Sequence, residues 1–179
     1  MEGYELAEKS AKEAGFTYTA KLDVGTLELL DAVRDMCAAN TCGKYGANWA
    51  CPPGCGELRE LREQVARYRW GILVQTVGDV EDSMDYEGIM EAEKQHKASF
   101  YAAAAKLKEQ FPDMLALGAG CCTLCKECTY PSAPCRFPEK RVSSMESYGI
   151  LVSDLCKKNG MSYYYGPQKM AYTACYLFC

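Results

Sequence analysis

Two groups of four closely spaced cysteines constrain this chain more than any other feature of its sequence. Twelve of its 179 residues are cysteines. Both groups lie in stretches without helical or strand periodicity, and such stretches need disulfides or a bound metal to order them. The grouped cysteines are Cys37, Cys42, Cys51 and Cys55, and then Cys122, Cys125, Cys128 and Cys135.

The start of the chain favours metal ligation over disulfides, and its net charge limits the kinds of partner. Residues 1–9 lack the charged and apolar segments of a secretion signal, and no apolar run approaches the roughly 20 residues of a membrane span. We therefore expect a cytoplasmic protein whose thiols stay reduced and serve as metal ligands. The net charge of -4 argues against nucleic-acid binding and leaves protein or small-molecule partners.

The apolar spacing predicts one α/β domain over residues 1–179, with a mixed β-sheet flanked by helices. With 49% hydrophobic residues, such a domain can bury a core without disulfides. Helices are expected at 4–14, 26–36, 57–68, 86–110 and 146–158. Strands are expected at 16–22, 70–77, 114–118, 161–165 and 171–178, and cysteine loops at 37–56 and 120–140.

The second cysteine loop carries the stronger metal motif. Cys122, Cys125 and Cys128 are three residues apart, like the C-x2-C-x2-C run of bacterial ferredoxins, and Cys135 supplies a more distant fourth thiolate. A ferredoxin has three residues before its last cysteine, whereas six stand here. The spacing predicts a [4Fe–4S] cluster, with zinc as the alternative because C-x2-C pairs also form zinc sites.

The first loop has a less regular spacing but the same composition of ligands. Cys37, Cys42, Cys51 and Cys55 are expected to hold a second [4Fe–4S] cluster, with zinc again the alternative. Its fourth ligand is open, because Cys121, Cys175 or Cys179 could replace Cys55. The first loop also contains Tyr45 and Trp49, which are expected to pack the loop onto the sheet.

Several other residues could be taken for metal ligands or catalytic groups, but the sequence does not support such roles. Cys121 and Cys122 are neighbours whose side chains diverge, so they are not expected to bind the same iron. Cys156, Cys175 and Cys179 are expected to pack as small hydrophobic residues. His96, the only histidine, stands among charged residues and is expected on the exposed face of its helix.

The cysteine motifs also carry a resemblance to a known family. Cys42-Gly43-Lys44-Tyr45-Gly46, Trp49-Ala50-Cys51-Pro52-Pro53, the later cysteine run and Ser144-Met145-Glu146-Ser147-Tyr148-Gly149-Ile150 resemble domain-of-unknown-function family 2284 from about Arg34 onward. Its members are described as predicted metal-binding proteins, a description that names no reaction. The resemblance implies metal binding at Cys37, Cys42, Cys51, Cys122, Cys125, Cys128 and Cys135.

These observations lead to three expectations about function. The first is electron transfer to or from a redox partner protein, because fully cysteine-ligated iron leaves no free site for a substrate. The second is a cluster-dependent redox enzyme with an incompletely ligated iron or a reactive thiol such as Cys55 or Cys121. The third is a structural zinc module used in protein interaction.

Overall fold

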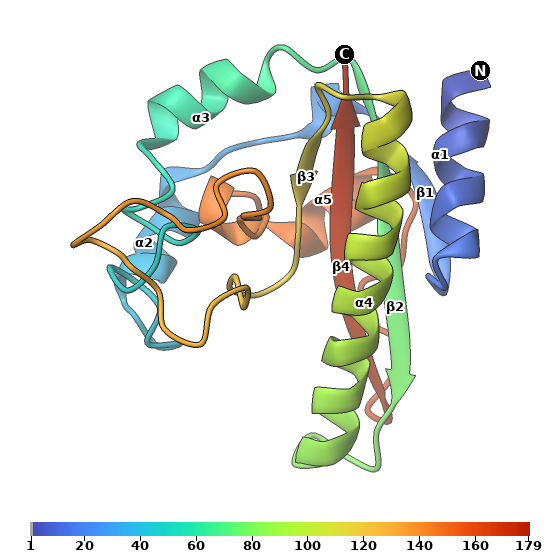
Figure 1. The fold of residues 1–179 in the computed structure, drawn as a ribbon. Coiled ribbons are helices and arrows are strands. Elements are labelled where there is room, and N and C mark those ends of the chain that lie inside the picture. Colours follow the sequence, from blue (N-terminus) through green and yellow to red (C-terminus); the bar gives the residue numbers. More distant parts are fainter. Residues whose placement is uncertain (1) are drawn as a thin grey trace.

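A four-stranded antiparallel sheet with the strand order β1-β2-β4-β3 lies at the centre of the fold (Figure 1). This computed structural model describes residues 2–179. The strands are β1 (Tyr18–Leu22), β2 (Trp70–Asp79), β3 (Leu115–Leu117) and β4 (Lys169–Phe178). The α-helices are α1 (Glu2–Glu13), α2 (Asp31–Ala38), α3 (Leu58–Val65), α4 (Tyr86–Gln110) and α5 (Val152–Lys158), and the 3₁₀ helices are η1 (Val24–Thr26) and η2 (Glu146–Tyr148).

Both faces of the sheet are buried because alternate residues of β2 and β4 enter two separate cores. Ile72 and Val74 of β2 pack with α1 and α4 on one face, and Tyr176 of β4 joins them. Leu73 and Cys175, which are register partners, point to the opposite face. A strand covered on both faces is expected to read as a nearly continuous apolar run, as β2 and β4 do.

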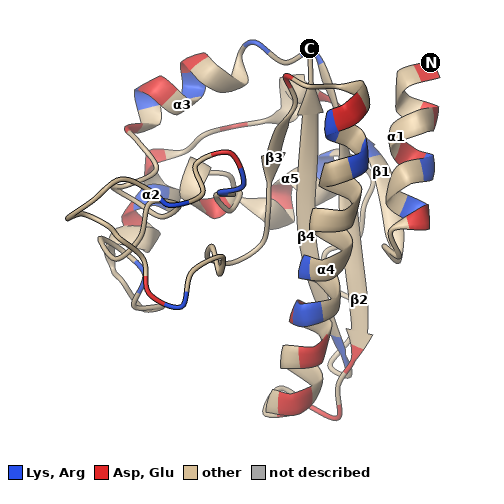
Figure 2. Cartoon of the chain, viewed as in Figure 1, with Lys and Arg blue, Asp and Glu red and all other residues tan. Residues whose placement is uncertain are grey.

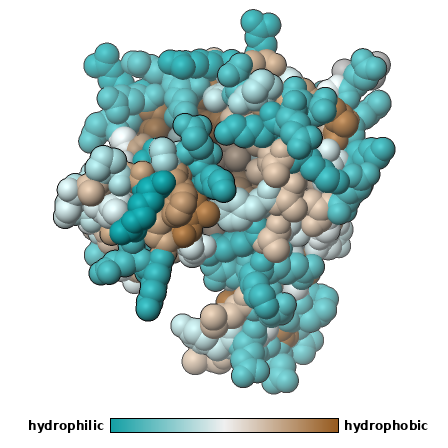
Figure 3. All heavy atoms as spheres, in the orientation of Figure 1, coloured by the Kyte–Doolittle hydropathy of each residue, from teal (hydrophilic) through white to brown (hydrophobic). Residues whose placement is uncertain are grey.

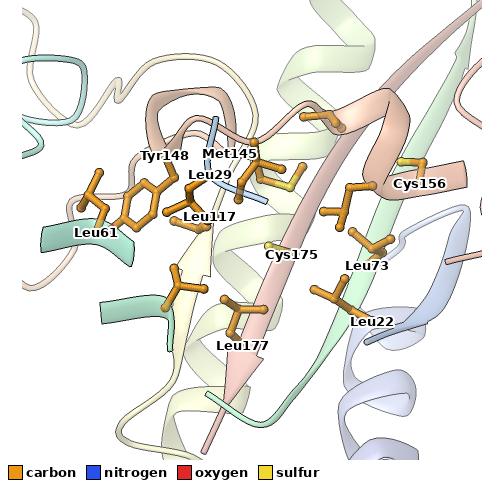
Figure 4. Close-up of a cluster of buried hydrophobic side chains, with 14 of the residues drawn as sticks. Leu22, Leu29, Leu61, Leu73, Leu117, Met145, Tyr148, Cys156, Cys175 and Leu177 are labelled. Carbon is orange, nitrogen blue, oxygen red and sulfur yellow. The ribbon is translucent and has the colours of Figure 1, made fainter. Parts of the chain in front are cut away.

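The second core lies between the sheet, α3, η2 and α5 (Figure 4). Figure 4 shows Cys175 beside Leu73 and Leu177, with Cys156 above them on α5. Both cysteines are fully buried in this apolar cluster. The core therefore holds α5 and η2 against the sheet, and these elements follow directly after the second cysteine loop.

The predicted α/β class is confirmed, and most of the predicted elements are present. Helix α4 has the predicted ends; it begins after Asp85, whose side chain accepts a hydrogen bond from the amide of Gly88. The four strands pair antiparallel, and within residues 2–179 parallel pairing occurs as an isolated bridge between Gly118 and Ser144. Within residues 2–179, no helix is long and apolar enough to cross a membrane.

Three predicted elements differ from the structure. The expected helix 26–36 is divided into η1 and α2, because Leu30 is extended and its amide donates to the carbonyl of Gly149. The expected helix 146–158 is divided by Gly149, whose φ of 77° ends η2 in a left-handed turn. Residues 161–165 do not form the expected strand; the Ser162 carbonyl accepts from the side chain of Gln75 instead of joining the sheet.

The two cysteine loops lie side by side on one side of the sheet, beyond β3 (Figure 1). The first loop connects α2 to α3, and the second connects β3 to η2. The fold thus brings together two segments that are separated in sequence by α3, β2, α4 and β3.

Candidate metal centres

Hydrogen bonds at the end of β3 close the base of the second cysteine loop. The amide of Gly118 donates to the Ser143 carbonyl at 2.9 Å, and the amide of Met145 donates to the Gly118 carbonyl at 3.1 Å. Within the loop, the Arg136 guanidinium donates to the Glu127 carbonyl at 2.7 Å. These contacts fix both ends of a segment that has no regular secondary structure of its own.

All four predicted cysteines of the second loop line one small cavity of about 30 Å³. Arg141 lies on its wall with Trp49 and Phe137. The four thiols are partly buried. The lining cysteines are Cys122, Cys125, Cys128 and Cys135.

Arg34 anchors the first cysteine loop to the rest of the protein. Its guanidinium donates to the carbonyls of Ser147 and Gly56, both at 3.0 Å. Inside the loop, the side chain of Asn40 accepts from the Tyr45 amide at 3.0 Å, and the Gly46 amide donates to the Pro52 carbonyl at 2.8 Å. The first loop is therefore held by polar contacts within it and by the half-buried guanidinium of Arg34 from α2.

Three predicted cysteines of the first loop line a larger cavity of about 420 Å³ together with Cys121. The three are Cys37, Cys42 and Cys51, and Cys55 is not on the cavity wall. Glu93 of α4 and the Ser144–Ser147 segment complete the opposite wall. Figure 3 shows hydrophobic surface gathered on the lobe that carries the loops, beside a hollow that separates this lobe from the lower end of the molecule.

Cys55 lies behind this cavity instead of facing it. Its Sγ is 3.7 Å from the Ser147 carbonyl oxygen and 3.8 Å from Nη1 of Arg34, and the side chain packs against the apolar core beneath α3. The structure therefore does not bring Cys55 together with the other three cysteines around one cavity.

Burial raises the pKa of three thiols in the first loop. For Cys37, the Glu146 carboxylate adds to this effect. For Cys51, the thiol of Cys121 adds to it, although a hydrogen bond with Asn48 acts in the opposite direction. Burial also raises the pKa of Cys55, against the influence of Arg34. Without metal these thiols keep their protons at neutral pH, so metal binding must release protons.

The two loops pack directly on each other through Trp49. Its indole Nε1 donates to the Ala133 carbonyl at 3.1 Å, and its ring meets Tyr130 edge to face at 4.9 Å. The expectation that Tyr45 and Trp49 pack their loop onto the sheet is wrong. Tyr45 is exposed and lines the first cavity, and the loop opposite Trp49 offers it both an aromatic ring and a hydrogen-bond acceptor. A Cβ at Gly54 would lie 2.6 Å from the Asn48 carbonyl oxygen and 2.9 Å from the Tyr130 ring, so only glycine fits at this contact.

The two cavities have different charged residues on their walls. Figure 2 marks the charged residues along the chain. The second cavity has Arg141 on its wall, whereas the first has Glu93, Glu146 and Lys44. Arg136, which the sequence places next to Cys135, donates to a carbonyl of its own loop. Arg141 is therefore the basic side chain next to the second group of thiols.

His96 is buried, and the expectation of an exposed histidine is wrong. It is 1% exposed and lies on the face of α4 that packs against the sheet, in line with Ala92, Phe100, Ala103 and Leu107. Its Nδ1 is 3.0 Å from Oγ1 of Thr76, and its Nε2 has no partner among the described residues. The helical spacing of these residues, and not the charges next to His96, was the signal for burial.

The remaining cysteines lie outside both cavities. Cys156 and Cys175 pack in the core as expected. The same expectation for Cys179 is wrong, because this residue follows the end of β4 and is exposed. Burial raises the pKa of Cys175 strongly, which makes its thiolate unfavourable. None of these three residues lines either cysteine cavity.

The donor set fits an iron–sulfur cluster or zinc, because both bind cysteine thiolates. Within residues 2–179, no three His, Cys, Asp or Glu side chains form a tight group that could hold a single metal ion. The cysteines share two cavities without forming a closed coordination sphere around one ion.

A comparison with protein families gives a match over most of the chain. The family model described as "Predicted metal-binding protein (DUF2284)" matches residues 20–178. The match begins before the first cysteine motif and includes all four strands but for the first residues of β1. Neither a curated protein nor a solved structure matches the chain significantly.

Proposed function

Because the chain belongs to the DUF2284 family of predicted metal-binding proteins, we propose that it is an iron–sulfur protein that holds two [4Fe–4S] clusters and takes part in electron transfer. The observation that carries this proposal is the lining of each cavity by four cysteines. A cluster held by four thiolates accepts and releases single electrons.

The spacing of the second group supports iron and sulfide over zinc. Three thiols at intervals of three residues match the run that wraps a cubane in bacterial ferredoxins. Trp49 and Phe137 give the cavity wall apolar surface, and Arg141 offsets negative charge there. Cytoplasmic location and a redox partner protein are part of the same proposal, since a reducing compartment preserves free thiols.

The test is the metal and sulfide content of protein purified without oxygen. About eight irons and eight sulfides per chain are expected for two cubane clusters, with EPR signals after reduction. Cys125→Ser should reduce the iron content by about half, whereas Cys179→Ser, which alters an exposed thiol outside both cavities, should leave it unchanged. Stoichiometric zinc without sulfide would contradict the proposal and favour a structural zinc module.

The volume of the first cavity supports a second candidate, a redox enzyme that uses its cluster on a small molecule. Its 420 Å³ falls within the range of about 300–1,000 Å³ that is typical of ligand pockets. Lys44, Glu93 and Glu146 on its wall could orient a polar substrate. A change in the EPR spectrum of the first cluster on adding small metabolites would favour this candidate over electron transfer alone.

A further inference from the structure

Cys121 and Cys122 are consecutive residues, and each lines a different one of the two cysteine cavities, although both also border a small third cavity beside α4. Cys121 lies on the wall of the first cavity with Cys37, Cys42 and Cys51, whereas Cys122 lies on the wall of the second with its three loop partners. Gly120 precedes them with a φ of 70°, a left-handed turn that directs the chain between the two sites as it leaves β3.

Cys55 is unsuited to complete the first group. Its Sγ faces the Ser147 carbonyl and Arg34, and Arg34 is itself held by the carbonyls of Gly56 and Ser147. Moving the Cys55 thiol into the first cavity would require these contacts to break. Cys121 already lies there.

We propose that Cys121, and not Cys55, is the fourth ligand of the first metal centre, so that the Cys121–Cys122 peptide bond joins the ligand sets of both centres. This assignment rests on the proposed function and deepens it. The Cα atoms of the two residues are about 3.8 Å apart across a trans peptide, which keeps the two centres close together. Both loops then supply ligands to the first centre, whereas the second loop alone supplies the ligands of the second centre, next to Trp49.

The assignment predicts opposite results for two matched substitutions. Cys121→Ser should lose the first centre and keep the second, so iron and sulfide fall by about half from about eight each. Cys55→Ser removes a thiol of the first loop and should keep both centres. Cys122→Ser should lose the second centre and keep the first. Loss of the first centre in Cys55→Ser, with full content in Cys121→Ser, would overturn the assignment.

A second measurement compares the unaltered protein with the two variants that are each expected to keep one centre. When both clusters are reduced, their unpaired spins should interact because adjacent residues hold them. We expect a broadened and split EPR spectrum that differs from the sum of the spectra of Cys121→Ser and Cys122→Ser. A spectrum equal to that sum would contradict the proposal that adjacent residues hold the two clusters.

The same experiments separate failure of the assignment from failure of the proposed function. Zinc without sulfide in the unaltered protein would contradict the iron–sulfur function. The ligand assignment would then be read from zinc content, because Cys121→Ser should lose one zinc of two and Cys55→Ser should lose none. Equal loss in both variants, with circular dichroism spectra unchanged, would overturn the assignment.

Discussion

At the scale of single residues, cysteine has different roles in the core and in the two loops. Burial in the apolar core raises the pKa of Cys175 and makes it a packing residue. The cysteines of the two loops border cavities instead. Position in the fold, and not residue type, therefore separates candidate ligands from core residues.

Cys175→Ala tests this separation. The substitution removes a fully buried sulfur between Leu73 and Leu117, so we expect a loss of about 1 kcal/mol in the free energy of unfolding. The metal content should not change. Urea unfolding and metal analysis check both, with the exposed Cys179→Ala as the control; loss of metal from Cys175→Ala would show that the core cysteine is a ligand.

His96 gives the protein a dependence of stability on pH. Burial lowers the pKa of His96 to about 4, from an ordinary value of 6.5. The unfolded chain binds the proton more tightly, so the stability that neutral His96 contributes is present above pH 6.5 and is lost as pH falls toward 4. Between pH 7 and pH 5 the loss is about 2 kcal/mol.

His96→Phe isolates this contribution. Phe16, Phe100 and Tyr172 surround the ring, so a phenyl group fits there without a titratable nitrogen. The difference in the free energy of unfolding between the two proteins should shift by about 2 kcal/mol in favour of the variant from pH 7 to pH 5, as measured by urea unfolding. A pH-independent difference would contradict a neutral, buried His96.

At the scale of elements, the two loops depend on one another. Neither has regular secondary structure, and Trp49 of one binds the other. Hydrogen bonds fix the ends of the second loop to β3 and η2, while Arg34 fixes the first to Ser147. Much of the order in each loop therefore comes from contacts outside it.

Gly54→Ala tests the contact between the loops. The added methyl group would meet the Asn48 carbonyl and the Tyr130 ring, and overpacking of this kind costs about 1–3 kcal/mol. We expect faster loss of metal from both centres in the presence of a chelator. Gly25→Ala is the control, because the atoms nearest to its added Cβ belong to the side chain of Asp23. Equal rates of metal loss in the two variants would show that the contact between the loops does not stabilise the metal centres.

The sequence predicted the scaffold better than the site because the two depend on different distances along the chain. Periodic apolar residues report local structure, so α4 and the central strands could be predicted. Cys122, Cys125 and Cys128 are close in sequence and share a cavity as expected. The contact of Cys121 with the first loop, and that of Trp49 with Tyr130, arise from tertiary packing that no local pattern records.

At the scale of the whole molecule, the sheet places both candidate centres on one side, next to each other and in different surroundings. Arg141 borders the second cavity, while two carboxylates and one ammonium border the first. Positive charge stabilises a reduced cluster and negative charge destabilises it. The second centre should therefore have the higher reduction potential.

A redox titration followed by EPR checks this order. Arg141→Gln should lower the potential of the second centre by tens of millivolts, as expected for loss of an interaction of about 1 kcal/mol, and leave the first nearly unchanged. Arg136→Gln should lower this potential less, because the Arg136 guanidinium donates to a carbonyl of its own loop. A lower potential at the second centre than at the first would contradict the charge argument.

The packing of Trp49 on the second loop also has a consequence for how the protein matures. Tyr130 and Ala133, which contact Trp49, are synthesised only after α3, β2, α4 and β3. The β4 strand, between β2 and β3 in the sheet, is synthesised later still. Metal insertion at both sites is therefore expected to follow synthesis of β4. A chelator added during translation should delay metal loading without delaying folding of the sheet.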